Sequence, residues 1–225
     1  MISNPENLAR MRAWDITSPE TEGMHACIVP GAQDCKSVHI YRLNLSAGNS
    51  YTLKSETLEM NPVLICGRAR VTCNAFEETM QARDSFYIPG KSTVELEAEE
   101  DAVFYIGAAE DEGYGAPFFR RFDPTLPLGN IHQIHGHGVG EREVFFTLNP
   151  EVPASRLLCG LTWGGNGSWT SWPPHQHEKD LEEAYCYFDM DAPKFGLHLS
   201  YLKSGETEDV VAHTVRSGSM ILAPV

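Results

Sequence analysis

The sequence predicts an all-β protein built from two similar units that follow one another along the chain. Short runs in which apolar and polar residues alternate recur about every ten residues, as expected for half-buried strands. No segment between them has the apolar period of an amphipathic helix. Two stretches, RDSFYIPG around Pro89 and SGSMILAP around Pro224, resemble each other and indicate an internal duplication. Together these observations favour two antiparallel sandwiches or barrels in tandem.

Residues 1–22 are expected to form an N-terminal segment that precedes the first β unit. They show no strand period. Residues 4–14 can form a short helix with Asn4 as its N-cap and Pro5 at the first helical position, where an N–H would be unpaired in any case.

The first β unit is expected to span residues 23–109. Glycines and an aspartate separate its short strands. The expected strands lie in VHIYRLNLSAG, SYTLKSETLEM, PVLICG, ARVTCNAF, SFYIPG, STVELEAEE and AVFYIGAA.

Residues 110–142 are rich in glycine and proline and poor in strand pattern, so we expect a linker there. The second β unit is expected to span residues 143–225. Its expected strands lie in EVFFTLN, RLLCGLTWG, SWTSW, EAYCYFDM, GLHLSYLK, VVAHTVRSG and MILAPV.

The two units differ in length beyond the matching prolines. The first continues for about twenty residues and two strands past Pro89, whereas the sequence stops at Val225, directly after Pro224. Because an open barrel exposes unpaired strand edges, we expect the native chain to continue beyond Val225 and to supply the closing strands of the second unit.

Composition narrows the class of partner. A net charge of -14 and an isoelectric point near 5 argue against nucleic acid and anionic membrane surfaces. No apolar run approaches the roughly 18 residues of a membrane helix, and the N-terminus lacks the apolar core of a signal peptide. The six scattered cysteines predict reduced thiols in a cytoplasmic protein.

The chemistry is expected in residues 172–189, WPPHQHEKDLEEAYCYFD. On a strand, His175 and His177 would point to the same side, and a glutamate at the start of the next strand, Glu182 or Glu183, could join them across a hairpin. Two imidazoles and one carboxylate suit Zn²⁺, and also Mn²⁺ or Fe²⁺. The alternative is a pair of surface histidines.

The segment RLLCGLTWGGNGSWTSWPPHQHEKDLEEAYCYF resembles the 5-deoxy-glucuronate isomerases and the related 5-keto-4-deoxyuronate isomerases of the cupin superfamily. In that family a G-x-W-S-S-x-P-P-H-x-H block precedes a glutamate that opens a short aromatic strand. The matching residues are Gly167, Trp169, Ser171, Pro173, Pro174, His175, His177 and Glu183. Glu183 is favoured over Glu182 because the aromatic run AYCYF follows it directly.

The resemblance implies a bicupin, two tandem jelly-roll-like β-barrels (double-stranded β-helices), with a divalent metal that is often zinc. It implies aldose–ketose isomerisation, with conversion of 5-deoxy-glucuronate to 5-dehydro-2-deoxygluconate in myo-inositol catabolism as the expected reaction. The first barrel lacks an H-x-H pair and is expected to be structural. The family's fourth ligand, a downstream histidine, is expected beyond Val225.

Residues near the metal ligands are candidates for the proton transfers of an isomerase. The general base is left open among Glu182, Glu178 and Tyr185, and Lys179 could pair with a substrate carboxylate. For Lys179 a solvated loop residue is the plainer interpretation. His198 or His213 could replace the missing ligand, although histidines hydrogen-bonded within the sheet are the default.

Two other functions compete with the isomerase. Two histidines and a glutamate also suit an iron-dependent cupin oxygenase, and the same fold could serve a non-catalytic sugar-binding protein. The expected partner is a small sugar acid, with no nucleic acid and no membrane, and a homo-oligomer is left open.

Overall fold

The computed structural model describes residues 3–175, 177, 181–204 and 207–224 and divides the chain into two compact units. Unit 1 combines Met1–Arg42 with His177–Val225, and unit 2 is Leu43–Gln176. The boundaries of these two units differ from those of the domains predicted at residues 23–109 and 143–225. The predicted domain boundaries therefore stay a prediction. Among the described residues, no helix is long and apolar enough to span a bilayer.

The helix of unit 1, α1 (Pro5–Arg12), confirms the prediction from its cap residues. The side chain of Asn4 accepts a hydrogen bond from the backbone N–H of Glu6, and Pro5 opens the helix. The Asp209 carboxylate accepts hydrogen bonds from the backbone N–H of Asn4 and the amide of Asn7. The helix is thereby tied to a strand of its own unit.

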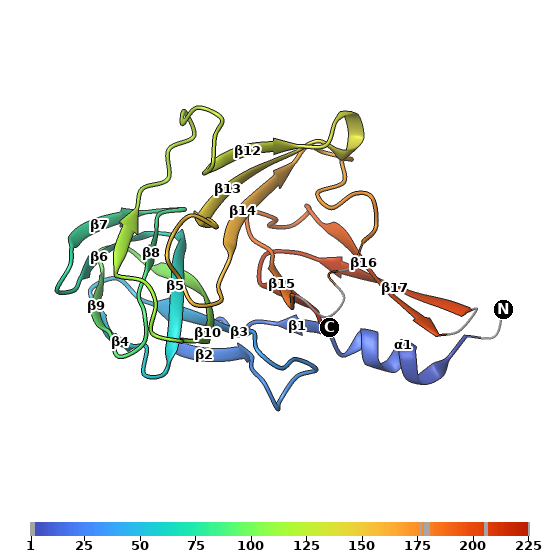
Figure 1. The fold of residues 1–225 in the computed structure, drawn as a ribbon, viewed down its shortest axis with the longest axis horizontal. Helices are drawn as coiled ribbons and strands as arrows, with labels where there is room; N and C mark the ends of the chain where they lie inside the picture. Colours follow the sequence, from blue (N-terminus) through green and yellow to red (C-terminus); the bar gives the residue numbers. More distant parts are fainter. Residues whose placement is uncertain (1–2, 176, 178–180, 205–206, 225) are drawn as a thin grey trace. The chain divides into compact units, whose positions relative to one another are not determined.

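The strands of unit 1 form two antiparallel groups (Figure 1). A three-stranded sheet has the order β1-β18-β15, and β16 pairs with β17 as a hairpin. A further strand, β2, lies beside β3, the strand on which the division between the units falls. The bounds are β1 Asp15–Thr17, β2 Gly23–Ile28, β3 His39–Leu45, β15 Glu183–Cys186, β16 Gly196–Ser204, β17 Thr207–Val215 and β18 Ser219–Ala223.

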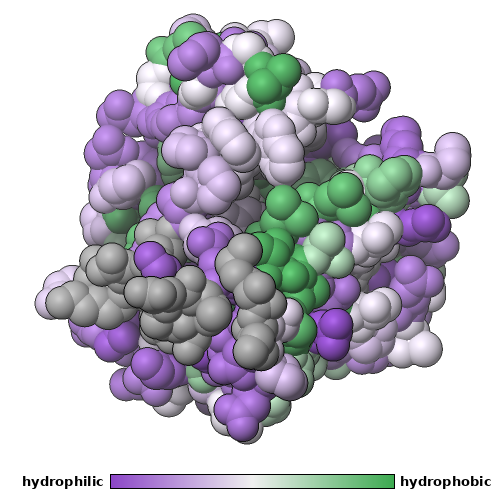
Figure 2. Space-filling view, turned by 90° about the vertical axis from the view of Figure 1, so that its right-hand side faces the viewer, coloured by the Kyte–Doolittle hydropathy of each residue, from purple (hydrophilic) through white to green (hydrophobic). Residues whose placement is uncertain are grey.

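The hairpin β16–β17 turns three polar side chains inward. His198, Ser200 and His213 face inward, whereas the alternating residues Leu197 and Leu199 are exposed. Figure 2 shows a group of apolar residues exposed on one face of the molecule. The inward face therefore carries the groups that can do chemistry.

Unit 2 contains a β sandwich and a third, three-stranded sheet. One layer of the sandwich has the order β11-β8-β5-β10-β3 and the other has the order β4-β9-β6-β7. The third sheet has the order β12-β13-β14. The bounds are β4 Ser50–Lys54, β5 Leu58–Cys66, β6 Arg68–Thr72, β7 Glu77–Gln81, β8 Ser85–Tyr87, β9 Thr93–Ala98, β10 Ala102–Glu110, β11 Phe118–Arg120, β12 His132–His135, β13 Arg142–Leu148 and β14 Cys159–Gly164; a 3-10 helix covers Gly138–Gly140.

Alternation explains the layers of unit 2. Along β9, the buried residues Val94, Leu96 and Ala98 alternate with exposed ones, so one face packs on the core. In β5, residues 59–64 are all buried, as expected for a strand that is covered on both faces.

The observed strands correct the prediction in four places. SYTLKSETLEM is not one strand, because a turn at residues 55–57, in which Glu56 has a φ of 50°, ends β4 and the residues after it join PVLIC in β5. SWTSW is not a strand, because Pro173 and Pro174 follow it without an N–H for a ladder and the N–H of Trp169 is bonded to the carbonyl of Val139 instead. The expected linker at 110–142 contains β11 and β12. Three strands, β1, β2 and β7, carry too few alternating apolar residues to have been recognised.

Candidate functional site

The candidate site of unit 1 starts at the first residue of β15, as predicted for the glutamate. One carboxylate oxygen of Glu183, Oε2, accepts a hydrogen bond from the hydroxyl of Tyr185 at 2.9 Å. The same oxygen lies 3.4 Å from Nε2 of His177. Because strand residues two apart share a face, Glu183 and Tyr185 project together.

The spacing of His177 and Glu183 fits a shared metal ion. Two donors that each lie about 2.1 Å from a tetrahedral zinc are about 3.4 Å apart, which is the separation of these two atoms. Their side chains are 34% and 39% exposed, so a small ligand has access. Tyr185 would then orient the ligating carboxylate from outside the coordination shell.

The neighbouring Glu182 has a different environment. Its carboxylate accepts three backbone N–H groups, from Lys36 at 2.7 Å, Ser37 at 2.7 Å and Val38 at 3.1 Å. Both of its oxygens are therefore occupied by one loop of unit 1. This arrangement anchors the loop to the start of β15 and argues against Glu182 as the base.

His175 lies in unit 2, outside any strand, so the expectation that an H-x-H strand aligns both imidazoles is wrong for this segment. Its ring is exposed, and Nδ1 donates a hydrogen bond to the carbonyl of Pro173 at 2.9 Å. This tautomer leaves Nε2 with a lone pair that can bind a metal.

Two other predicted residues, Glu178 and Lys179, lie outside the described residues. Within the residues that the structure does describe, no three His, Cys, Asp or Glu side chains form a group that could hold a metal.

The sequence pattern indicated His198 only as a substitute ligand and did not predict the residues that surround it. Its Nδ1 lies 2.8 Å from the hydroxyl of Tyr187, and its ring meets that of Tyr185 edge-on at 5.0 Å. His213, opposite it in the hairpin, is bonded to Ser200 at 3.1 Å. The alternation of polar residues in GLHLSYLK was the available signal.

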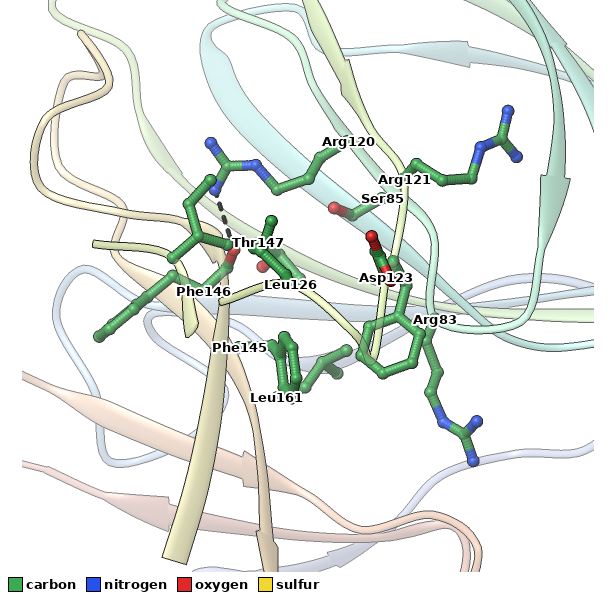
Figure 3. Close-up of a pocket in the computed structure, with 12 residues that line it drawn as sticks. Arg83, Ser85, Arg120, Arg121, Asp123, Leu126, Phe145, Phe146, Thr147 and Leu161 are labelled. Atoms are coloured by element: carbon green, nitrogen blue, oxygen red, sulfur yellow. Dashed lines mark hydrogen bonds between the residues drawn. The ribbon is translucent and has the colours of Figure 1, made fainter. Parts of the chain in front are cut away.

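Unit 2 contains a small cavity, which is lined by none of the candidate site residues described above (Figure 3). Its volume is about 20 Å³, room for about one water molecule. Ser85 and Arg120 line it together with Phe145 and Leu161. A sugar acid does not fit there.

Comparison with known proteins identifies the relatives. The family model described as the KduI/IolB family matches residues 16–225. A 5-deoxy-glucuronate isomerase from Geobacillus kaustophilus is 25% identical over 224 residues, covering 92% of this chain and 79% of the relative. Another, from Lacticaseibacillus casei, is 30% identical over 174 residues, covering 68% of this chain and 61% of the relative.

The fold has a close counterpart among solved structures. The crystal structure of an IolB-like protein from Salmonella typhimurium LT2 superposes with a TM-score of 0.72 at 20% identity, covering 93% of this chain and 84% of that one. The all-β bicupin fold expected from the sequence is confirmed.

Proposed function

Since the chain belongs to the KduI/IolB family, we propose that it is a metal-dependent isomerase that interconverts the aldose and ketose forms of a deoxy-uronate sugar acid. The proposed reaction is the conversion of 5-deoxy-glucuronate to 5-dehydro-2-deoxygluconate in myo-inositol catabolism, in the cytoplasm. Relatives named 5-deoxy-glucuronate isomerase support this choice of substrate.

The observation that carries the proposal is the contact between His177 and Glu183. An imidazole nitrogen and a carboxylate oxygen lie 3.4 Å apart, with the hydroxyl of Tyr185 on the same oxygen. A half-exposed carboxylate with two such neighbours suits a ligand-binding role better than a purely structural one.

We propose His175, His177 and Glu183 as the protein ligands of a divalent metal, most simply Zn²⁺, with Mn²⁺ and Fe²⁺ as alternatives. When bound, the metal would polarise the carbonyl of the open-chain sugar and acidify the neighbouring hydroxyl and C–H groups.

The other residues have proposed roles that follow from their contacts. Tyr185 holds Glu183 by a hydrogen bond and is the remaining catalytic candidate next to it. Glu182 fixes the start of β15 through the amides of residues 36–38 and is not proposed as the base. Lys179 stays a candidate for binding the substrate carboxylate.

The test combines an activity assay with metal analysis. Purified protein is incubated with 5-deoxy-glucuronate without oxygen, product is followed by NMR, and bound metal is measured by mass spectrometry. The expected result is anaerobic conversion and about one divalent metal per chain. His177→Ala should lose most of the metal and at least about 100-fold of the activity.

His25→Ala is the matched control, because the His25 ring is hydrogen-bonded to Thr21 in an exposed contact. It should keep both metal and activity. Product formation that requires O₂ and Fe²⁺ would instead support the oxygenase, and a protein without metal and without turnover would support the sugar-binding alternative.

A further inference from the structure

His198 lies on the same face of unit 1 as the proposed metal ligand. It projects from β16 and contacts the rings of Tyr185, on β15, and Tyr187, the residue that directly follows β15. The hydroxyl of Tyr185 joins this group to Glu183 at 2.9 Å. Only one side chain therefore separates the His198 ring from the carboxylate of Glu183.

The surroundings of His198 keep its ring uncharged. Burial, and then the neighbouring His213 with its ring centre 6.1 Å away, lower the pKa of His198 to about 4. At neutral pH the ring is consequently a neutral imidazole, with one nitrogen that donates and one that accepts a hydrogen bond.

The two ring nitrogens of His198 have different partners. Nδ1 is bonded to the hydroxyl of Tyr187. Burial, followed by the charges of Cys186 and Asp15, raises the pKa of Tyr187, so its hydroxyl keeps its proton and can donate it to Nδ1. In that arrangement the ring proton resides on Nε2.

The second nitrogen is open to a ligand. Within residues 3–175, 177, 181–204 and 207–224, no side chain or backbone group hydrogen-bonds to Nε2 of His198. Nε2 of His198 is not one of the fully buried side-chain atoms that lack a hydrogen-bond partner, so it is not sealed off from a ligand. A neutral, oriented N–H group thus lies beside the proposed site with its hydrogen bond unused.

We propose that His198 is a catalytic residue of this site, whose Nε2 hydrogen-bonds to the oxygens on C1 and C2 of the sugar acid and passes a proton between them. The proposal rests on the isomerase function proposed above. A separate base moves the carbon-bound proton from C2 to C1. A neutral histidine that donates a hydrogen bond to a substrate carbonyl is a known device for such enediol reactions.

The proton balance closes without a further reactant. As the C2–H bond breaks, its electron pair forms the C1–C2 double bond and the carbonyl oxygen on C1 takes the Nε2 proton. Nε2 then takes the proton of the C2 hydroxyl as the C2 carbonyl forms and C1 receives the carbon-bound proton. The ring of His198 ends in the state in which it began.

The test compares four variants with the wild type. His198→Phe should lower kcat about 100-fold or more with little change in KM, because proton transfer by a positioned group contributes about 100- to 10,000-fold. His198→Gln, whose amide can still hydrogen-bond, should recover part of this loss. Tyr187→Phe should lower kcat about 10-fold, because without the Tyr187 hydroxyl the ring proton of His198 is no longer held on Nε2. His25→Gln should match the wild type, and circular dichroism checks that each variant is folded.

A binding measurement separates this proposal from the function on which it rests. In the wild type, ¹⁵N NMR should show His198 as the Nε2–H tautomer at pH 7, and D-glucuronate should shift this Nε2 signal. If the wild type isomerises 5-deoxy-glucuronate but His198→Phe keeps more than a third of its kcat, the role of His198 is disproved.

If the wild type shows no isomerisation at all, the proposed function fails instead. In that case a glucuronate-induced shift still supports His198 as a sugar-binding group. No shift at saturating glucuronate overturns the proposed contact between His198 and the sugar.

Discussion

Each of the two units contains a glutamate that accepts three consecutive backbone N–H groups. In unit 2, Glu59 binds those of residues 155–157, at 2.7, 2.5 and 2.7 Å. In unit 1, Glu182 binds those of residues 36–38. Glu59 is fully buried and also accepts the hydroxyl of Tyr87, whereas Glu182 is half-buried.

The two glutamates occupy equivalent positions relative to the two matching prolines, Pro89 and Pro224. The turns before β8 and β18 each contain a residue with positive φ six positions before the matching proline, Arg83 at 76° and Gly218 at 89°. When these turns are aligned, Ile88 corresponds to Ala223. The strand partner of Ile88 is Met60 and that of Ala223 is Glu183.

Glu59 and Glu182 therefore correspond, and the strands differ in the residues after them. On the face that starts one residue later, unit 2 has the buried residues Met60, Pro62 and Leu64. Unit 1 has Glu183, Tyr185 and Tyr187. We call each glutamate with its three backbone N–H donors a clamp. The clamp of Glu59 is followed by a packed core in unit 2, and the clamp of Glu182 is followed by a row of polar groups in unit 1.

The largest effect is expected at the buried clamp. In Glu59→Gln, the amide NH₂ faces backbone donors, so buried N–H groups lose their acceptor. We expect the free energy of unfolding to fall by about 4 kcal/mol. Urea denaturation measures it, with the exposed Glu77→Gln as control. A loss below about 1 kcal/mol would show that the clamp of unit 2 is dispensable.

The polar face of unit 1 should make stability depend on pH. Because the pKa of folded His198 is about 4 and that of the unfolded residue is about 6.5, the unfolded chain binds more protons between these values. The contribution of the neutral His198 ring to the free energy of unfolding is complete above pH about 6.5. It is lost as the pH falls toward 4, which lowers the free energy of unfolding by up to about 3 kcal/mol.

Urea denaturation of the wild type and of His198→Gln at pH 7 and pH 4.5 measures this contribution. The wild type should lose more stability than the variant on acidification. Equal losses would mean that the His198 ring is protonated in the folded protein at pH 4.5, which would contradict the lowered pKa.

The half-buried Glu182 should matter less for stability than the buried Glu59. In Glu182→Gln, water can replace the lost carboxylate oxygen, and we expect a loss of about 1 kcal/mol. Hydrogen exchange should become faster at the amides of residues 36–38. If this change costs as much as Glu59→Gln, burial does not explain the difference between the two clamps.

The smallest change in stability is expected where the site itself is altered. Glu183→Met gives unit 1 the residue that unit 2 has at this position. We expect the free energy of unfolding to change by less than about 0.5 kcal/mol, since the carboxylate is half-exposed, while bound metal and isomerase activity are lost. A loss of about 2 kcal/mol would show that Glu183 is mainly structural.

Local sequence was sufficient for much of this protein. The cap at Asn4 and Pro5 located α1, alternation located most strands, and the matching turns at Pro89 and Pro224 indicated the duplication. These features depend on near neighbours in the chain, through side-chain period, proline geometry and capping. The position of a glutamate at the start of β15 was likewise predictable from the local sequence.

The tertiary structure alone gave Glu182 and Glu183 different surroundings and gave His198 its neighbours. Adjacent glutamates share one local context, and their environments depend on backbone donors at residues 36–38 that are far away in the sequence. The state of His198 likewise depends on Tyr187 and His213, which approach only when β15, β16 and β17 pack together. Desolvation and hydrogen bonding between distant segments have no signature in the linear pattern.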